Sequence, residues 1–308
     1  MNTFPQSVEI CDVGPRDGLQ GLLSFVPTAR KVQLIEDLIA AGLRSVEVAS
    51  FVSPKAIPQM RDAREVVTSL KRHPGVSFSA FVPNSRGGEA ALEMGVDCLS
   101  IATYASEEFS RRNVNATVAE ANERIREVVR LTRGTTTRVR GYVSCAVDCP
   151  VAGPIPAARS AALAAELLEI GCDEIYLADT TGGGTAASVG RLSDAVLERV
   201  PAERLGIHVH DTYGQGLTNI RECLQRGIAR IDTSVAGLGG CPNAEGAAGN
   251  LATEDLLVLL AGMGISTGID TERVASIGAE LCRDLGIRND SKAGRAIAAR
   301  SNPSRRTT

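Results

Sequence analysis

Short apolar runs alternate along the chain with segments in which apolar residues recur at helical spacing. The runs are rich in β-branched residues, which is typical of buried strands, and the spacing between them is typical of helices that cover a sheet. The expected strands are Val8–Val13, Ser45–Ala49, Val76–Val82, Cys98–Thr103, Arg138–Cys145, Glu174–Asp179, Gly206–Asp211 and Arg230–Ala236. The expected helices include Thr28–Ala41, Val114–Thr132, Pro156–Ile170, Ser188–Val200 and Gly216–Arg226.

This order of elements predicts an α/β fold, a (β/α)₈ TIM barrel with a C-terminal helical extension. Alternating strands and helices imply parallel strand pairs with right-handed crossovers, and eight such units within about 250 residues fit the barrel. A doubly wound open sheet is the alternative, but the glycine-rich phosphate loop that it would place after the first strand is absent. Two more helical segments follow, Leu251–Gly262 and Glu272–Leu285.

We therefore expect a single domain over residues 1–308, and no Pro/Gly/Ser-rich linker divides the chain. The barrel is expected to cover about residues 5–265 and the helical extension about 266–300. The polar residues 301–308 are expected to form a frayed tail.

Composition excludes several classes of protein. The chain has 308 residues, is 44% hydrophobic and carries a formal net charge of −3. No apolar stretch is long enough to cross a membrane, no secretory signal opens the chain, and no basic cluster suggests nucleic acid. The eight scattered cysteines are typical of reduced thiols. We expect a cytoplasmic protein that acts on a small molecule.

The lysines bear on the chemistry because Schiff-base catalysis needs a lysine in the site. The chain has only Lys31, Lys55, Lys71 and Lys292, and none lies in an expected strand. A Schiff-base aldolase barrel is therefore disfavoured, and carbon–carbon bond chemistry here would need a metal ion.

Two of the three histidines, His208 and His210, lie at the end of the seventh expected strand. Residues two apart on a strand point to the same face, so both imidazoles would face the barrel mouth. A pair of buried histidines suits a divalent metal better than a structural role, and Mg²⁺, Mn²⁺, Fe²⁺ and Zn²⁺ all remain open. The third, His73, precedes Pro74 and is expected in a solvated loop.

Carboxylates follow other strands, where barrels place their active sites. Arg16 and Asp17 follow the first strand between turn-forming residues, and Asp17 is the natural carboxylate partner of the histidines. Glu47 lies in an apolar strand and needs a partner, for which Arg16 is available. Asp179 ends the sixth strand, and a structural role competes there with a supporting role near the metal.

A glycine-rich segment, residues 237–250, follows the eighth strand. It is either a flexible connector or a lid that carries Cys241 over the site. Asn250 lies at the expected start of the next helix, where a helix N-cap and a metal ligand are competing interpretations.

Together these motifs resemble the family of 3-hydroxy-3-methylglutaryl-CoA lyases, which are metal-dependent barrel lyases, over nearly the whole chain. The matching motifs are Gly14–Gln20, Ser50–Lys55 with Pro58–Met60, Arg140–Cys145, His208–Gln215, Ala236–Pro242 and Gly249–Asp255.

The resemblance implies a role for each matching residue. Asp17, His208, His210 and Asn250 would hold Mg²⁺ or Mn²⁺, and Arg16 would stabilise an enolate oxygen. Glu47 would orient Arg16, and Cys241 would transfer a proton. Supporting or substrate-binding positions would be Gln20, Ser50, Tyr142 and Asp179. A homodimer is also expected from the family.

The implied reaction is retro-aldol cleavage of a tertiary 3-hydroxy acyl-CoA into acetyl-CoA and a keto acid. A metal ion makes the hydroxyl group more acidic, and the enolate that leaves needs a fixed cation. The chain departs from the usual pattern at Gly21–Leu23, Asn243 and Tyr176, which lie toward the substrate rim. A related substrate such as citramalyl-CoA therefore remains an alternative.

Two other hypotheses remain. A barrel synthase that condenses acetyl-CoA with a keto acid would share the Arg16–Gly18 and His208–His210 motifs, but it usually carries a further C-terminal domain. A catalytically idle binding barrel would be expected to have lost a ligand or Arg16, and neither is lost.

Overall fold

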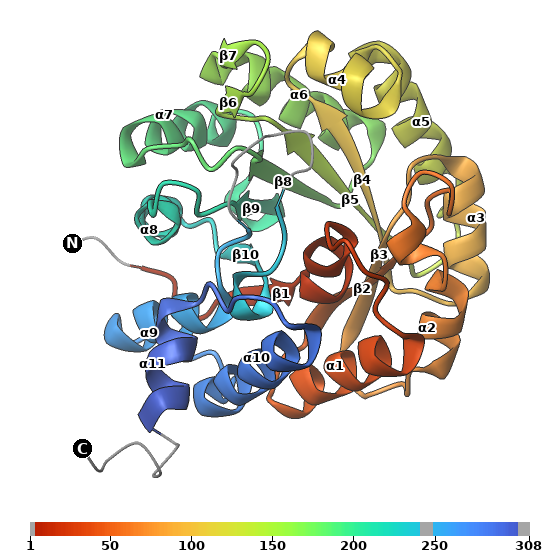
Figure 1. Cartoon of the computed structure of the whole chain (residues 1–308). Coiled ribbons are helices and arrows are strands. Elements are labelled where there is room, and N and C mark those ends of the chain that lie inside the picture. Colours follow the sequence, from red (N-terminus) through yellow and green to blue (C-terminus); the bar gives the residue numbers. More distant parts are fainter. Residues whose placement is uncertain (1–3, 241–248, 301–308) are drawn as a thin grey trace.

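A computed structural model describes residues 4–240 and 249–300 of the chain. Eight parallel strands close into a barrel in the order β1-β10-β9-β8-β5-β4-β3-β2, with helices around them (Figure 1). The predicted barrel is confirmed, and closure excludes the open sheet. The barrel strands are β1 (Glu9–Asp12), β2 (Ser45–Ser50), β3 (Ser77–Phe81), β4 (Cys98–Tyr104), β5 (Arg138–Ser144), β8 (Glu174–Asp179), β9 (Leu205–Val209) and β10 (Arg230–Thr233).

Helices connect the strands and cover the outside of the barrel (Figure 1). A short antiparallel pair, β6 (Asp148–Cys149) and β7 (Gly153–Pro154), follows β5. The helices are α1 (Thr28–Ala40), α2 (Ala63–Ser69), α3 (Ser85–Glu93), α4 (Glu107–Val114), α5 (Val118–Leu131), α6 (Ala157–Ile170), α7 (Ala186–Leu197), α8 (Gly216–Gln225), α9 (Thr253–Gly262), α10 (Thr271–Leu285) and α11 (Lys292–Arg300). Within the described ranges, none of these helices has both the length and the apolar character needed to span a bilayer.

The expected helical extension is present as α10 and α11, which pack against α9 (Figure 1). The buried carboxylate of Asp255, in the first turn of α9, fastens the start of α11. It accepts hydrogen bonds from Ser291 Oγ at 2.9 Å and from the Ala293 backbone N–H at 2.6 Å. The extension is therefore joined to the last barrel helix by side-chain capping as well as by apolar contact.

The helix predicted over Val114–Thr132 is present as α5, but it begins at Val118, four residues later than predicted. Asn115 has a left-handed backbone conformation (φ 49°) that ends α4. Thr117 then starts α5 with a capping box, in which its hydroxyl accepts from the Glu120 N–H and the Glu120 carboxylate accepts from the Thr117 N–H. Apolar spacing continued across this break, so periodicity alone did not reveal it.

Two predicted boundaries near the glycine-rich segment are also wrong. The strand expected to reach Asp211 ends at Val209, and His210 instead forms an isolated antiparallel bridge with Asn250. The strand expected to reach Ala236 ends at Thr233, and Ala236 has a positive φ of 58°. Both strands thus end two or three residues earlier than the apolar pattern indicated.

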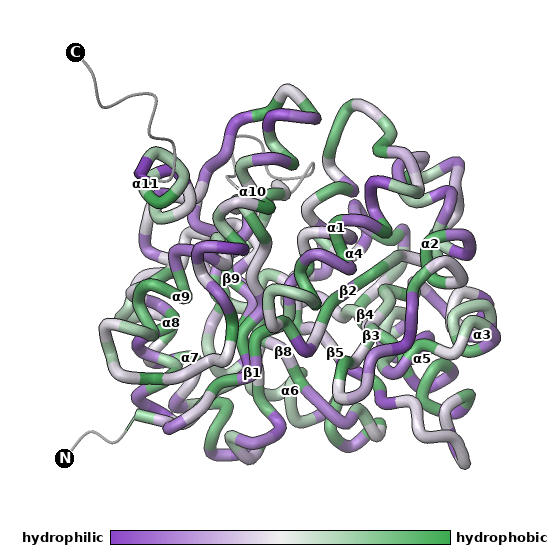
Figure 2. Tube along the Cα trace, turned by 90° about the horizontal axis from the view of Figure 1, so that it is seen from below, coloured by the Kyte–Doolittle hydropathy of each residue, from purple (hydrophilic) through white to green (hydrophobic). Residues whose placement is uncertain are grey.

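The main hydrophobic core lies between the strands and the surrounding helices. Hydrophobic and hydrophilic positions alternate along those helices, as Figure 2 shows, and α1 buries Leu34, Ile35 and Leu38 completely. The inside of the barrel differs because it also holds large polar side chains, of which Arg140 and Tyr176 are the bulkiest. The Arg140 guanidinium lies 4.3 Å from the centre of the Tyr176 ring.

The Tyr176 ring fits inside the barrel because the neighbouring strand β9 has glycine at the facing position. A Cβ atom on Gly206 would overlap the ring of Tyr176. We therefore expect Gly206→Ala to lower the free energy of unfolding by about 1–3 kcal/mol through overpacking. Chemical denaturation measures this change.

Gly262→Ala is the matched control, because a Cβ atom there would meet nothing within 4 Å at the end of α9. We expect it to leave stability unchanged or to raise it by up to about 1 kcal/mol. Equal effects of the two substitutions would contradict the steric explanation.

Candidate metal-binding active site

The site begins in a turn of π-helix, Gly14–Gly18, that directly follows β1. Both end positions need glycine because other groups approach closely. A Cβ atom at Gly14 would lie 2.7 Å from Asp12 Oδ1, and one at Gly18 would lie 2.8 Å from the Leu238 Cβ atom. The turn is thus packed tightly against the start of the glycine-rich segment, which sets the position of Arg16 and Asp17.

Arg16 is a buried cation between two carboxylates. Its Nε donates to Glu47 Oε2 at 2.5 Å, and its Nη1 donates to Asp17 Oδ1 at 2.7 Å. The guanidinium also lies 5.0 Å from the centre of the Phe81 ring. Burial raises the pKa of Glu47, although the charge of Arg16 opposes that shift. The pairing of Glu47 with Arg16 that the sequence suggested is therefore present.

Asp17, His208 and His210 form a compact group of possible metal ligands. One donor atom from each residue lies within 4.8 Å of the others. Burial raises the pKa of Asp17, but the charges of Arg16, His208 and His210 outweigh burial and lower it to about 2. Asp17 is therefore an anion at neutral pH, as a ligand for a divalent cation must be.

Asn250 joins this group and is not a helix cap. Helix α9 begins at Thr253, and the N-cap interpretation is therefore wrong. The Asn250 amide donates from Nδ2 to Asp17 Oδ2 at 2.9 Å and to the Leu238 carbonyl at 3.1 Å. Its Oδ1 is buried and has no hydrogen-bond partner among the described residues. A side chain that contacts the Asp17 carboxylate and also carries an unsatisfied oxygen fits the surroundings of a divalent cation.

Asp179 lies at the end of β8, next to β9, which carries His208 and ends directly before His210. Its Oδ2 accepts a hydrogen bond from the Gly184 backbone at 2.9 Å, and its backbone carbonyl accepts one from the His210 N–H at 3.3 Å. Burial raises the pKa of the Asp179 carboxyl to about 6. Asp179 thus supports the backbone around His210.

Three of the other four predicted site residues lie in the described part of the chain. Gln20 is partly exposed directly after the π-helical turn. Tyr142 is buried, and its hydroxyl donates to Asp232 Oδ2 at 2.7 Å. Ser50 is fully buried at the end of β2. Cys241 lies outside the described residues.

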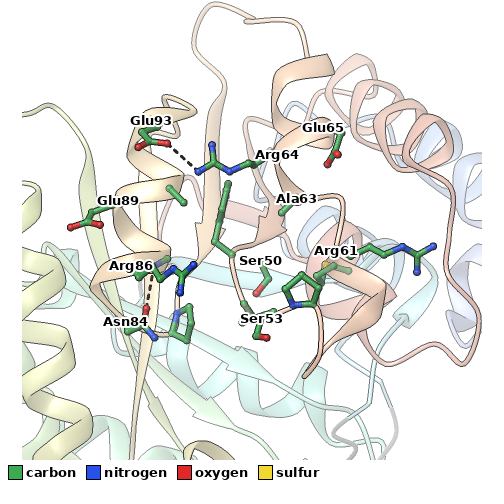
Figure 3. Close-up of a pocket in the computed structure, with 17 residues that line it drawn as sticks. Ser50, Ser53, Arg61, Ala63, Arg64, Glu65, Asn84, Arg86, Glu89 and Glu93 are labelled. Atoms are coloured by element: carbon green, nitrogen blue, oxygen red, sulfur yellow. Dashed lines mark hydrogen bonds and ion pairs between the residues drawn. The ribbon is translucent and has the colours of Figure 1, made fainter.

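Ser50 belongs to the wall of a cavity of about 620 Å³ between α2 and α3 (Figure 3). The ion pair Arg64–Glu93, at 3.0 Å, crosses this cavity from one helix to the other. Three arginines and three glutamates line the cavity, so its charges balance. We therefore assign it no ligand.

Asp232 is a site residue that the sequence reasoning missed. It lies on β10, is 1% exposed, and its Oδ2 is 3.1 Å from His208 Nδ1. A carboxylate within an apolar strand was the signal that identified Glu47, and the same signal could have identified Asp232.

His73 lies in a loop, as expected, and about a third of its side chain (32%) is exposed. The structure adds a partner, because its Nε2 lies 2.7 Å from the Glu36 carboxylate. This pair does not belong to the metal-ligand group.

Comparison with known families supports a relationship over most of the chain. The HMGL-like family model matches residues 7–280. A relative from Pseudomonas aeruginosa, named 3-hydroxy-3-isohexenylglutaryl-CoA/hydroxy-methylglutaryl-CoA lyase, is 47% identical over 97% of this chain and 99% of its own length.

Two solved structures have the same fold. The hydroxymethylglutaryl-CoA lyase from Pseudomonas aeruginosa is 47% identical, with a TM-score of 0.94 over 97% of this chain and 100% of its own. An HMG-CoA lyase from Acinetobacter baumannii, solved in complex with coenzyme A and 3-methylmalate, is 36% identical. Its TM-score is 0.91 over 96% of this chain and 97% of its own.

The buried pair Arg16–Glu47 generates a test of stability. Glu47→Ala leaves the Arg16 guanidinium buried with one carboxylate fewer, so we expect a loss of about 3–5 kcal/mol in the free energy of unfolding. Denaturant titration in the presence of a chelator measures it without any contribution from metal. Glu93→Ala, which breaks the exposed pair with Arg64, is expected to cost less than about 1 kcal/mol. Similar losses of unfolding free energy in the two variants would contradict the expectation that the buried ion pair contributes more to stability than the exposed one.

Proposed function

The chain belongs to the HMGL-like family, and from this premise we propose that it cleaves 3-hydroxy-3-methylglutaryl-CoA to acetyl-CoA and acetoacetate. The observation that carries the proposal is the group of possible metal ligands formed by Asp17, His208 and His210. Arg16 lies next to this group and donates a hydrogen bond to Asp17. The names of the similar lyases from Pseudomonas and Acinetobacter support the substrate class. The retro-aldol chemistry follows from what these side chains can do.

Asp17, His208, His210 and Asn250 Oδ1 would hold a divalent cation, Mg²⁺ or Mn²⁺. A carboxylate and an amide oxygen suit these hard ions, and Mn²⁺ also accepts imidazole nitrogen. When bound, the cation would make the tertiary hydroxyl group of the substrate more acidic.

Arg16 would act on the other fragment. Once the hydroxyl group has lost its proton, the C2–C3 bond breaks and the C3–O bond becomes the carbonyl group of the ketone. The electron pair of the C2–C3 bond passes to the thioester, which leaves as an enolate. The Arg16 guanidinium would stabilise the enolate oxygen, because a buried cation held in advance does not have to reorganise. Glu47 keeps Arg16 in place through its hydrogen bond at 2.5 Å.

The reaction ends when a proton reaches the enolate carbon, which gives acetyl-CoA. We propose Cys241 as the group that delivers this proton, from its place in the motif shared with the lyases. The backbone before it, at Gly239, is in contact with Asn250: a Cβ atom at Gly239 would lie 2.5 Å from Asn250 Nδ2. The segment that carries Cys241 therefore starts beside the proposed metal ligands.

A cytoplasmic location and a homodimer are part of the proposal. The seven cysteines in the described ranges are all free thiols, which agrees with a reducing compartment. The homodimer is proposed from the family resemblance alone.

The substrate is tested by product analysis. We expect purified protein with Mg²⁺ to release acetyl-CoA and acetoacetate from 3-hydroxy-3-methylglutaryl-CoA, to stop when a chelator is added, and to resume with Mn²⁺. His210→Ala should abolish the activity, and His73→Ala should retain it because His73 lies apart from the site. Absence of both products would overturn the assignment. Cleavage of citramalyl-CoA alone would overturn the acyl group while retaining the metal-assisted mechanism.

The role of Arg16 is tested separately from metal binding. Arg16→Met removes the cation proposed for the enolate, so we expect kcat to fall by about 10²–10³-fold. Mn²⁺ affinity, measured by calorimetry, should change much less, because the four proposed ligands remain. Turnover equal to that of the unsubstituted protein would rule out the enolate role, and the thermal unfolding midpoint checks that the variant is folded.

A further inference from the structure

Inside the barrel, a buried carboxylate contacts one histidine of the proposed metal site from behind. Asp232 Oδ2 lies 3.1 Å from His208 Nδ1 and accepts a hydrogen bond from the Tyr142 hydroxyl at 2.7 Å. The other carboxylate oxygen, Oδ1, faces the Arg140 guanidinium, with 3.7 Å between Oδ1 and Nη1. Asp232 and Arg140 are each 1% exposed, so water does not compete for these contacts.

The geometry decides which nitrogen of His208 carries the proton. A carboxylate only accepts hydrogen bonds, so the nitrogen that faces Asp232, Nδ1, must be the donor. In a neutral imidazole the other nitrogen, Nε2, then has a free lone pair. His208 takes part in the group with Asp17 and His210, and Nε2 is the atom that remains for a cation there.

We propose that Asp232 is a positioning residue that holds His208 in the tautomer and rotation needed for a divalent cation to bind through Nε2. This inference rests on the metal site of the proposed function and extends it by one residue. Partners of this kind fix the orientation of ligating histidines and raise their basicity, and their loss typically weakens metal binding by 10–100-fold.

Asp232 is itself held from two sides, which makes its orientation specific. Tyr142 donates to Oδ2, while Arg140 lies against Oδ1 and pairs with Glu174 Oε2 at 3.0 Å. The Tyr142 ring also meets the His208 ring edge-on, with 6.0 Å between the ring centres. The carboxylate thus connects the packed interior of the barrel to the ring of His208.

An amide does not reproduce the two acceptor oxygens of this carboxylate. In Asp232→Asn, the orientation that keeps an oxygen toward His208 turns the NH₂ group against the donor-only Arg140 cation. The reverse orientation places the NH₂ group toward His208 Nδ1 and favours a lone pair there instead of a proton. The substitution therefore removes the preference for the Nδ1–H tautomer while it changes the side-chain volume very little.

The direct test is ¹⁵N NMR of histidine-labelled protein without metal, at a pH where imidazoles are neutral. The chain has only three histidines, so the spectrum is simple, and His73→Gln assigns the reference signal. We expect the Nδ1–H tautomer for His208 in the unsubstituted protein and loss of that preference in Asp232→Asn. An Nε2–H tautomer in the unsubstituted protein would overturn the inference whether or not the variant folds.

Metal affinity provides the second measurement, with Mn²⁺ as the probe in calorimetry. We expect Asp232→Asn to weaken Mn²⁺ binding by 10–100-fold, and Tyr142→Phe to weaken it by less than 10-fold because the carboxylate remains. Glu36→Gln is the matched control, because it removes the carboxylate partner of His73 and should leave Mn²⁺ affinity unchanged.

The outcomes separate this inference from the proposed function. If the unsubstituted protein shows the expected tautomer but binds no Mn²⁺, the metal site of the proposed function fails, and with it the role of Asp232 toward a cation. If Mn²⁺ binds and Asp232→Asn binds it equally well, only the positioning role is overturned.

Discussion

The guanidinium of Arg16 lies between two carboxylates, and the arrangement of the barrel mouth depends on this charge pairing. Glu47 is fully buried and would be costly as an isolated anion, so its contact with Arg16 ties the turn after β1 to β2. The same cation lowers the pKa of Asp17 and leaves a carboxylate facing the two histidines. One interaction thus sets the position of the residue proposed for the enolate and the charge of a proposed metal ligand.

Below this mouth, the interior of the barrel is unusually polar. TIM barrels commonly fill their interior with layers of branched apolar side chains. Here Arg140, Glu174, Tyr142 and Asp232 occupy part of that space, and hydrogen bonds and ion pairs connect them. Contacts between buried polar groups can specify one arrangement, and in this barrel those contacts end at His208. Arg140 Nη1 and Asp232 Oδ1 face one another at 3.7 Å and have no hydrogen-bond partner among the described residues.

Close approach of backbones brings distant parts of the chain together at the site. Gly18 contacts Leu238, and a Cβ atom on Gly249 would overlap the carbonyl of Gly237. The turn after β1 and both described ends of the glycine-rich segment are therefore in contact. More than 200 residues of the chain separate this turn from the segment. This contact places Asn250 beside Asp17.

The sequence by itself was enough to predict the barrel, because the periodicities of strands and helices can be read from residues that are close together in the chain. It also placed His208 and His210 on one face, since side chains two apart on a strand share a direction. It did not locate the start of α5, where a capping box at Thr117 interrupts a continuous apolar pattern. The left-handed residue at Asn115 likewise leaves no trace in the spacing of apolar positions.

Tertiary structure alone decided which polar side chains meet. Asn250 could have been a helix cap or a ligand by sequence, and only the fold brings its side chain, with its unsatisfied oxygen, into contact with Asp17. The proposed role of Asp232 depends on its contacts with His208 and Tyr142, which lie on other strands. Local spacing determines where each side chain points, but the closure of the barrel determines what it faces, because closure brings together residues far apart along the chain.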